Sequence, residues 1–226
     1  MSIKFEVWGD YACFSRPELK VERVSYDVIT PSAARGILEA IFWKPAIKYV
    51  IDEIAVCSDI QFENIRRNEV NSKASPNVAF ICSSDDRSQR AALVLRNVRY
   101  VITAHFEPTD KLGERDKSPD GSFNHGKFTD IIKRRLKTGQ HFHQPYLGVR
   151  EFPAYTRLIE DGDDCPAPIN QSRSFGLMLY DIDFVWETQT DKKGNVTEVV
   201  NDRLPEYFFA EMNNGIIDLR NAEVLK

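Results

Sequence analysis

The sequence predicts an α+β fold in which spaced strands alternate with two amphipathic helices. Ile3, Phe5 and Val7 alternate with polar residues, which is the period of a half-buried strand. Residues 97–106 alternate in the same way. Between and after these segments, apolar residues recur at helical spacing over 33–41 and 128–136.

The first helix has clear start and stop signals. Thr30 is suited to be its N-cap, and Pro31 occupies the first helical position. Pro45 disfavours helical geometry in Lys44, so we expect the helix to end near Lys44. The preceding Phe42 and Trp43 are typical of core aromatics beside a helix terminator and alone carry no functional weight.

The middle of the chain is expected to contain strands and loops. Residues 47–65 are rich in Val and Ile and indicate one long strand or a bent pair. Residues 68–90 are polar and indicate a loop around a short apolar segment, and 107–124 indicate a mobile loop. A basic helix then ends at Gly139, a suitable C′ residue.

The order strand, helix, strand, strand, helix matches the ferredoxin-like (RRM-like) plan, with 140–147 entering the fourth strand. We therefore expect one such domain over 1–154. Residues 155–226 should form a small antiparallel β-sheet region, with an acidic loop at 160–164 and strands near 175–185 and 207–219. Asn214–Gly215 is a strong hairpin signal within the last segment.

Bulk properties restrict the class of protein. No segment approaches 18 uninterrupted apolar residues, and the N-terminus lacks the features of a signal peptide, so we expect no membrane association. Four scattered cysteines favour reduced thiols, a cytoplasmic location and no structural zinc. The net charge of −4 argues against a generally nucleic-acid-coating protein but leaves room for one basic face.

Such a face is predicted at residues 127–151, which hold six basic residues against two acids. His141 and His143 lie in this segment, and His125 lies just before it. Positive charge beside groups that titrate near neutral pH suits a phosphodiester substrate. The candidate RNA-binding residues are Lys133, Arg134, Arg135, Lys137, Phe142, Tyr146 and Arg150, the aromatic ones by stacking on bases.

Two other interpretations of these residues remain open. The basic helix is also typical of a plain solvated face. His141 and His143, as alternate residues on a strand, would project together as metal ligands, but no carboxylate or cysteine at a suitable spacing completes such a site. We therefore expect no metal and no other cofactor. Lys127 at the helix start suits an anion, since helix N-termini favour negative charge.

Three segments together resemble the Cas5 family of type I-C CRISPR systems (Cas5d). They are FEVWGDYACFSRPE (5–18), ERVSYDVITPSAARGILEAIFWKP (22–45) and GKFTDIIKRRLKTGQHFHQPYLGVREF (126–152). They occur in the family's order and spacing over the N-terminal two thirds, whereas the C-terminal third carries weaker signatures and is short for the family.

The resemblance implies a pre-crRNA endoribonuclease that cuts the repeat hairpin of precursor CRISPR RNA without metal. Attack by the 2′-hydroxyl would leave a 2′,3′-cyclic phosphate. It also implies that the protein stays on the crRNA 5′ handle, beside a Cas7-like backbone and a Cas8-like large subunit. Non-specific binding of double-stranded DNA belongs to the same expectation.

The family's catalytic set of tyrosine, lysine and histidine falls on Phe42, Lys127 and Phe128, so only the lysine is present. Neither phenylalanine can carry a proton. His125 is the candidate replacement base, and His141 or His143 the candidate acid from a neighbouring strand. The alternatives are a handle-binding subunit with little or no catalytic power, a metal-dependent non-specific nuclease, and an α+β domain whose basic helix is mere surface.

Overall fold

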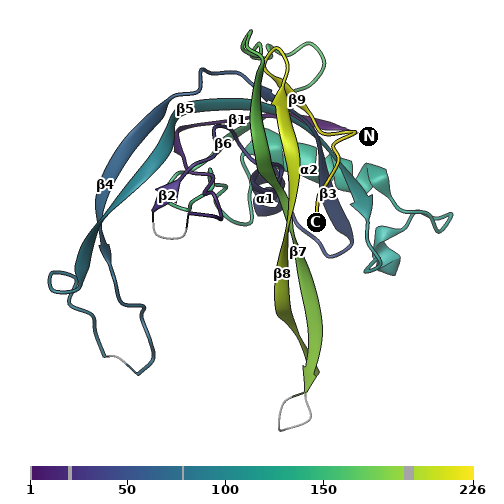
Figure 1. Cartoon of the computed structure of the whole chain (residues 1–226). Coiled ribbons are helices and arrows are strands. Elements are labelled where there is room, and N and C mark those ends of the chain that lie inside the picture. Colours follow the sequence, from purple (N-terminus) through teal and green to yellow (C-terminus); the bar gives the residue numbers. More distant parts are fainter. Residues whose placement is uncertain (1, 20–21, 78, 191–195) are drawn as a thin grey trace.

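The computed structural model describes residues 2–19, 22–77, 79–190 and 196–226, and this part of the chain is mostly antiparallel sheet (Figure 1). It contains two α-helices, α1 (Pro31–Ile41) and α2 (His125–Thr138), and a short 3-10 helix, η1 (Glu114–Asp116). The strands are β1 (Ile3–Ala12), β2 (Arg23–Val24), β3 (Ile47–Val56), β4 (Phe62–Val70), β5 (Arg87–Pro108), β6 (Tyr155–Leu158), β7 (Arg173–Thr190), β8 (Val196–Met212) and β9 (Ile216–Asp218).

The main sheet has the strand order β6-β1-β5-β3-β9, with antiparallel neighbours throughout. The fourth strand after α2 was expected at 140–147, and this was wrong: it lies at β6, where Phe5 to Trp8 pair with residues 155–158. Residues 140–147 cannot extend the sheet, because Pro145 donates no amide hydrogen bond and the chain turns at Gly148 (φ 84°).

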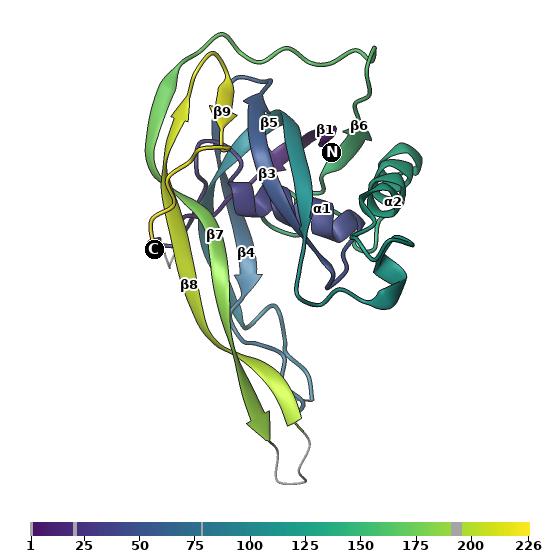
Figure 2. The ribbon, with the colours of Figure 1, turned by 90° about the vertical axis from the view of Figure 1, so that its right-hand side faces the viewer.

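Both helices cover one face of this sheet, and the hydrophobic core lies between the sheet and the two helices (Figure 2). The side chain of Thr30 accepts a hydrogen bond from the backbone of Ala33, so the expected N-cap of α1 is confirmed. α1 buries Ala34, Ile37, Leu38 and Ile41, and α2 buries Phe128, Ile132 and Leu136. α2 ends at Gly139 in the left-handed conformation (φ 68°), as expected.

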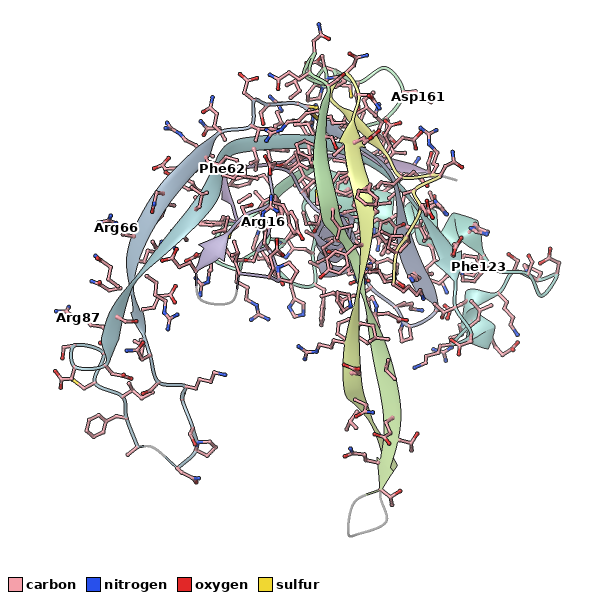
Figure 3. The ribbon with its side chains drawn as sticks, viewed as in Figure 1. Arg16, Phe62, Arg66, Arg87, Phe123 and Asp161 are labelled. Carbon is pink, nitrogen blue, oxygen red and sulfur yellow. The ribbon has the colours of Figure 1, made fainter. Side chains whose placement is uncertain are left out.

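β5 is 22 residues long and belongs to two parts of the molecule. Its C-terminal half lies between β1 and β3 in the body, and its N-terminal half pairs with β4 in a projecting arm. Residues 68–90 were expected to be a loop, but the arm's strands reach Val70 and begin again at Arg87. Figure 3 shows Arg66 and Arg87 on this arm, on the opposite side of the molecule from Phe123.

The C-terminal region contributes a second projection, the two-stranded hairpin of β7 and β8 (Figure 1). The salt bridge from Arg35 of α1 to Asp181 of β7 (2.7 Å) joins it to the body. Asn214 and Gly215 form the expected tight turn, both with positive φ. The strand after that turn, β9, pairs with β3. Two strands from the C-terminal region 155–226, β6 and β9, therefore belong to the main sheet, because β6 pairs with β1.

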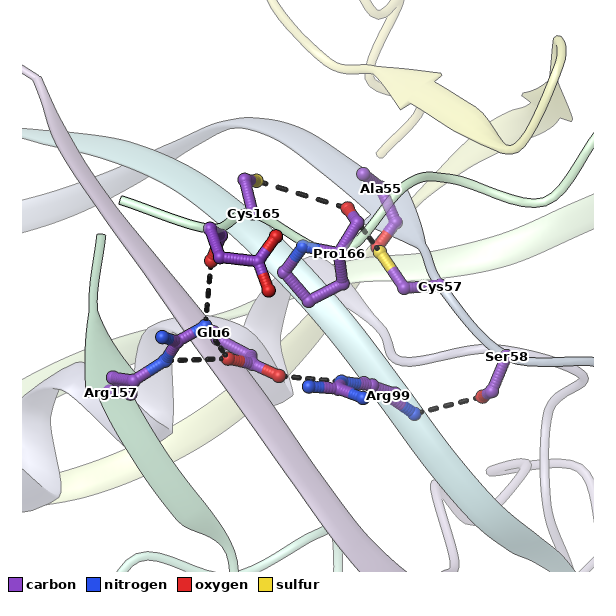
Figure 4. A network of polar contacts seen from close by, with 9 residues as sticks. Glu6, Ala55, Cys57, Ser58, Arg99, Arg157, Cys165 and Pro166 are labelled. Atoms are coloured by element: carbon purple, nitrogen blue, oxygen red, sulfur yellow. Dashed lines mark hydrogen bonds and ion pairs between the residues drawn. The ribbon is translucent and has the colours of Figure 1, made fainter. Parts of the chain in front are cut away.

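The sheet face opposite the helices holds a buried carboxylate between two arginines (Figure 4). Glu6 is 1% exposed. Its two oxygens accept hydrogen bonds from Arg99 (2.5 Å) and Arg157 (2.9 Å), which fix β1 to both neighbouring strands. Because a buried charge is stable only when compensated, this trio specifies the register of three strands.

After α2, residues 145–154 form a compact loop that packs on β1. Ala154 donates to the carbonyl of Pro145 (2.8 Å), Leu147 donates to that of Phe152 (2.8 Å), and Cys13, next to β1, donates to that of Leu147 (3.0 Å). Gly148 lies so close to this backbone that a Cβ there would overlap the Cys13 carbonyl oxygen.

We expect Gly148→Ala to lower the free energy of unfolding by more than about 2 kcal/mol, because it combines a positive φ with a backbone overlap. Gly121 is the matched control, since it has nearly the same φ (83°) but no atom within 4 Å of the place that an added methyl group would take. Gly121→Ala should lose only about 1 kcal/mol. Urea unfolding measures both, and equal losses would contradict the packing argument.

Candidate active site

The N-terminus of α2 gathers two lysines around one carboxylate. Asn124 caps the helix through its side-chain oxygen, which accepts a hydrogen bond from the Lys127 backbone (3.0 Å). The Lys127 ammonium donates to Asp116 Oδ1 (3.2 Å), and Lys44, just beyond α1, donates to the same oxygen (2.9 Å). The two ammonium groups are therefore close neighbours, although they are 83 residues apart in the sequence.

The three charges leave a net charge of +1 at this point. Asp116 is only 7% exposed, while both lysine side chains are about a third or more exposed. The hydrogen bond from Lys44 lowers the pKa of the Asp116 carboxyl, partial burial opposes this, and the bond from Lys127 lowers it further. The carboxylate thus orients two cations that remain accessible to an anion from solvent.

Aromatic rings form the floor beneath these cations. Phe42 and Phe128 are buried, their ring centres are 6.2 Å apart, and both lysine ammonium groups lie over the Phe128 ring at 5.5–5.7 Å. The two positions that resemble the family's tyrosine and histidine are thus core packing in this chain. His125, in contrast, is exposed, and its ring stacks on Phe106 (5.8 Å) and lies edge-on to Phe123 (4.5 Å).

His141 and His143 lie at the other end of α2. The helix has 14 residues, so about 20 Å of rigid backbone runs from His125 to the segment that carries them. The backbone of His143 donates to the carbonyl of Ala40 (3.0 Å), which fixes this segment to α1. Lys127 and His125 thus both lie in the first turn of α2, whereas His141 and His143 lie in the segment beyond its other end. The strand expected for these two is absent from this described segment.

The predicted RNA-binding residues of α2 differ in their surroundings. Arg134 is exposed and Lys133 half-buried along one groove, where the Lys137 ammonium pairs with Glu160 (2.6 Å). Arg135 turns inward, donating to the carbonyl of Ile41 (2.5 Å) and lying over the Phe42 ring. Arg135 therefore joins the two helices, whereas the other three face solvent.

Phe142, Tyr146 and Arg150 line a hollow of about 660 Å³ between α1 and the segment 142–150. Trp43 lines it from the α1 side and is 56% exposed, so its interpretation as a core aromatic was wrong. Sequence reasoning also missed Lys44 and Asp116. The signal for Trp43 and Lys44 was their position directly after the helix, where the chain leaves α1 in an extended conformation at Phe42.

Metal-binding and membrane-spanning features are both absent from the described residues. Within 2–19, 22–77, 79–190 and 196–226, no group of three or more His, Cys, Asp or Glu side chains is arranged to hold a metal ion. In the same part of the chain, neither helix has the length and apolar character needed to cross a membrane.

Comparison with known proteins gives the family. Residues 2–220 match the Cas5d model of the CRISPR-associated Cas5 proteins. The chain is 47% identical to a CRISPR pre-crRNA endoribonuclease Cas5d of Mannheimia succiniciproducens, over 96% of this chain and 94% of that protein. It is 41% identical to the protein of the same name from Thermus thermophilus, over 96% and 90%.

Solved structures agree on the fold. A functionally uncharacterised protein of Streptococcus mutans matches with a TM-score of 0.65 at 19% identity, over 100% of this chain and 97% of that one. A CRISPR-associated protein matches with a TM-score of 0.62 at 20% identity and the same coverage. The chain belongs to the Cas5d family of CRISPR-associated proteins.

Asp116→Asn tests the role given to the carboxylate. Because the pKa of Asp116 is lowered in the folded protein, its ion pairs add stability above the ordinary aspartate pKa near 4 and lose it as the pH falls through the lower folded value. We expect the variant to be less stable by about 1 kcal/mol at pH 7. The two unfolding curves should converge at acidic pH, and a constant difference would contradict the assignment.

Proposed function

We propose that this chain is an endoribonuclease that cuts the repeat hairpin of precursor CRISPR RNA at the N-terminus of α2. The observation that carries the proposal is the pair of ammonium groups, Lys44 and Lys127, held on Asp116 at that point, with His125 as the first residue of the same helix. The name shared by the two relatives supports the same substrate. After cutting, the protein stays on the 5′ handle of the crRNA as a subunit of an interference complex with Cas7-like and Cas8-like partners.

The strand order supports a more specific description of the fold. In the order β6-β1-β5-β3, the chain passes through β1, α1, β3, β5, α2 and β6, which is the β-α-β-β-α-β sequence of a ferredoxin-like (RRM-like) domain. In this description, the β4–β5 arm and the β7–β8 hairpin are additions to that domain.

The reaction needs a base, a cation and an acid but no metal. His125 removes the proton from the 2′-hydroxyl, whose oxygen bonds to phosphorus while the bond to the 5′-oxygen breaks. Lys127 stabilises the negative charge that develops on the phosphorane oxygens. Lys44, which shares Asp116 with Lys127, is placed to protonate the leaving 5′-oxygen. The products are a 2′,3′-cyclic phosphate and a 5′-hydroxyl.

The remaining predicted residues are assigned to binding. Lys133, Arg134 and Lys137 form a solvent-facing basic strip that suits the phosphates of the hairpin. His141 and His143, in the segment beyond the other end of α2, contact RNA in this proposal without moving protons. Arg135 is left out of the interface because the carbonyl of Ile41 holds its guanidinium.

Cleavage of the cognate repeat RNA in EDTA tests the active site. We expect Lys127→Ala to slow single-turnover cleavage about 10²–10³-fold and His125→Ala at least 10²-fold. His141→Ala and His143→Ala should leave this rate unchanged at saturating protein. Lys4→Ala is the control, because Lys4 is an exposed lysine on the sheet face away from the helices.

The same assay separates the competing functions. A gel shift without products would favour a handle-binding subunit with little catalytic power, an alternative that the buried Phe42 and Phe128 keep open. Cleavage that needs an added divalent metal would favour a non-specific nuclease. Wild-type rates in both Lys127→Ala and His125→Ala would contradict the proposed site.

Charge reversal on α2 tests the binding strip. Each lost phosphate contact lowers the slope of log K against log salt concentration by about one. Lys133→Glu and Arg134→Glu should therefore weaken RNA binding and flatten its salt dependence, while Lys4→Glu should leave the slope unchanged. A wild-type slope in the two α2 variants would remove the helix from the interface.

A further inference from the structure

We propose that the hollow between α1 and the segment 142–150 binds one unpaired nucleobase of the RNA, next to the phosphate that is cut. The inference rests on the proposed function and adds a base-binding subsite to it. The hollow is lined by Glu39, Trp43, Phe142, His143, Tyr146 and Arg150. Its volume of about 660 Å³ is within the range of roughly 300–1,000 Å³ common for small-ligand sites.

Exposed aromatic rings line the hollow from two separate elements. Trp43 comes from the end of α1, whereas Phe142 (73% exposed) and Tyr146 come from the segment beyond α2. Leaving large rings in water is unfavourable for a monomer unless a ligand covers them. Bases stack on such rings without regard to sequence, so an unpaired nucleotide is a suitable occupant.

Gly36 provides a second, independent observation. It lies in the interior of α1, where glycine is a poor helix former, and it lines the same hollow. A Cβ at this position would meet no atom within 4 Å, so packing inside the protein does not require glycine. A ligand that approaches the helix backbone would require it.

The charged side chains that line the hollow are Glu39 and Arg150. The Glu39 carboxylate is already paired with Arg35 (2.6 Å), which in turn pairs with Asp181. Arg150 has its positive charge at the rim, and the imidazole of His143 lies beside the Phe142 ring. One guanidinium thus balances two carboxylates, and the positive charge that an anionic ligand would meet is that of Arg150.

Chain geometry connects this hollow to the lysine pair. Trp43 and Lys44 are adjacent, and the backbone leaves α1 in an extended conformation at Phe42 (φ −152°, ψ 119°). Trp43 lines the hollow, and the ammonium group of the next residue, Lys44, donates to Asp116. A nucleotide whose base stacks on Trp43 would present its phosphate to Lys44 and Lys127.

The test combines protein variants with modified RNA. Repeat hairpins are prepared with a single abasic ribose at each unpaired position that flanks the stem. We expect Trp43→Ala to lower kcat/KM for cleavage about 10- to 100-fold. Trp43→Phe should keep most of the activity. Phe209→Ala is the control, because Phe209 is also a largely exposed ring but lies on β8, which contributes nothing to the hollow.

One abasic position should lower wild-type cleavage by a similar factor and have no further effect in Trp43→Ala, which identifies the base that the ring contacts. Independent, additive losses at every position would overturn the inference while leaving the proposed function intact, because the wild type would still cut. If the wild type neither bound nor cut repeat RNA, the proposed function would fail and the inference with it.

Gly36→Ala adds a second test, because a role in ligand binding predicts that stability rises while cleavage falls, and a purely structural role does not. The variant should melt about 2–4 °C higher, because alanine favours the helix and fits the available space. Its cleavage of repeat RNA should nevertheless fall several-fold, because the methyl group would occupy the floor of the hollow. Unchanged cleavage, or a lower melting temperature, would remove Gly36 from the argument.

Discussion

The pairing of one long strand, β5, is the constraint on which the rest of this structure depends. Its 22 residues pair with β1, β2, β3 and β4, so the body and the arm share one continuous backbone. The two helices rest on the sheet that β5 centres, and the loop that leaves its end carries Asp116. A shift of register in β5 would therefore move the carboxylate that orients Lys44 and Lys127.

At two positions of the site, buried phenylalanine rings stand where the family resemblance puts titratable side chains. Phe42 and Phe128 give α1 and α2 a shared apolar contact, and Arg135 adds a polar one. Phenylalanine at both positions makes the helix junction more hydrophobic and removes two titratable groups from the place where the family resemblance puts them. In the proposed reaction, proton transfer comes instead from His125, which stacks on Phe106, and from Lys44, which binds Asp116.

Local signals allowed the elements of the body to be predicted, and long-range contacts explain the failures. Thr30 and Pro31 define the start of α1, and Gly139 defines the end of α2, because each acts through its own neighbours. The β4–β5 arm was missed because the half-buried positions of β4 are mostly polar (Glu63, Arg67 and Glu69), so Phe62 to Val70 show no apolar alternation.

The candidate site shows the same division. Lys127 was placed at the start of its helix correctly. Its partner Asp116 lies in a segment expected to be a mobile loop, and no local pattern links it to Lys44, 72 residues earlier. The strand expected at 140–147 was wrong because hydrogen bonds to the Ala40 carbonyl and from the Cys13 amide hold that segment. Such contacts between distant residues form only in the tertiary fold.

The central place of β1 has a consequence for how the protein is made. β1 precedes the other described strands in the sequence, yet its partners are residues 95–104 and 155–158. At synthesis rates of about 5–20 residues per second, this apolar strand stays without a partner for roughly 5–20 s. Newborn chains are therefore exposed to aggregation through β1, and chains truncated before β5 can never cover it.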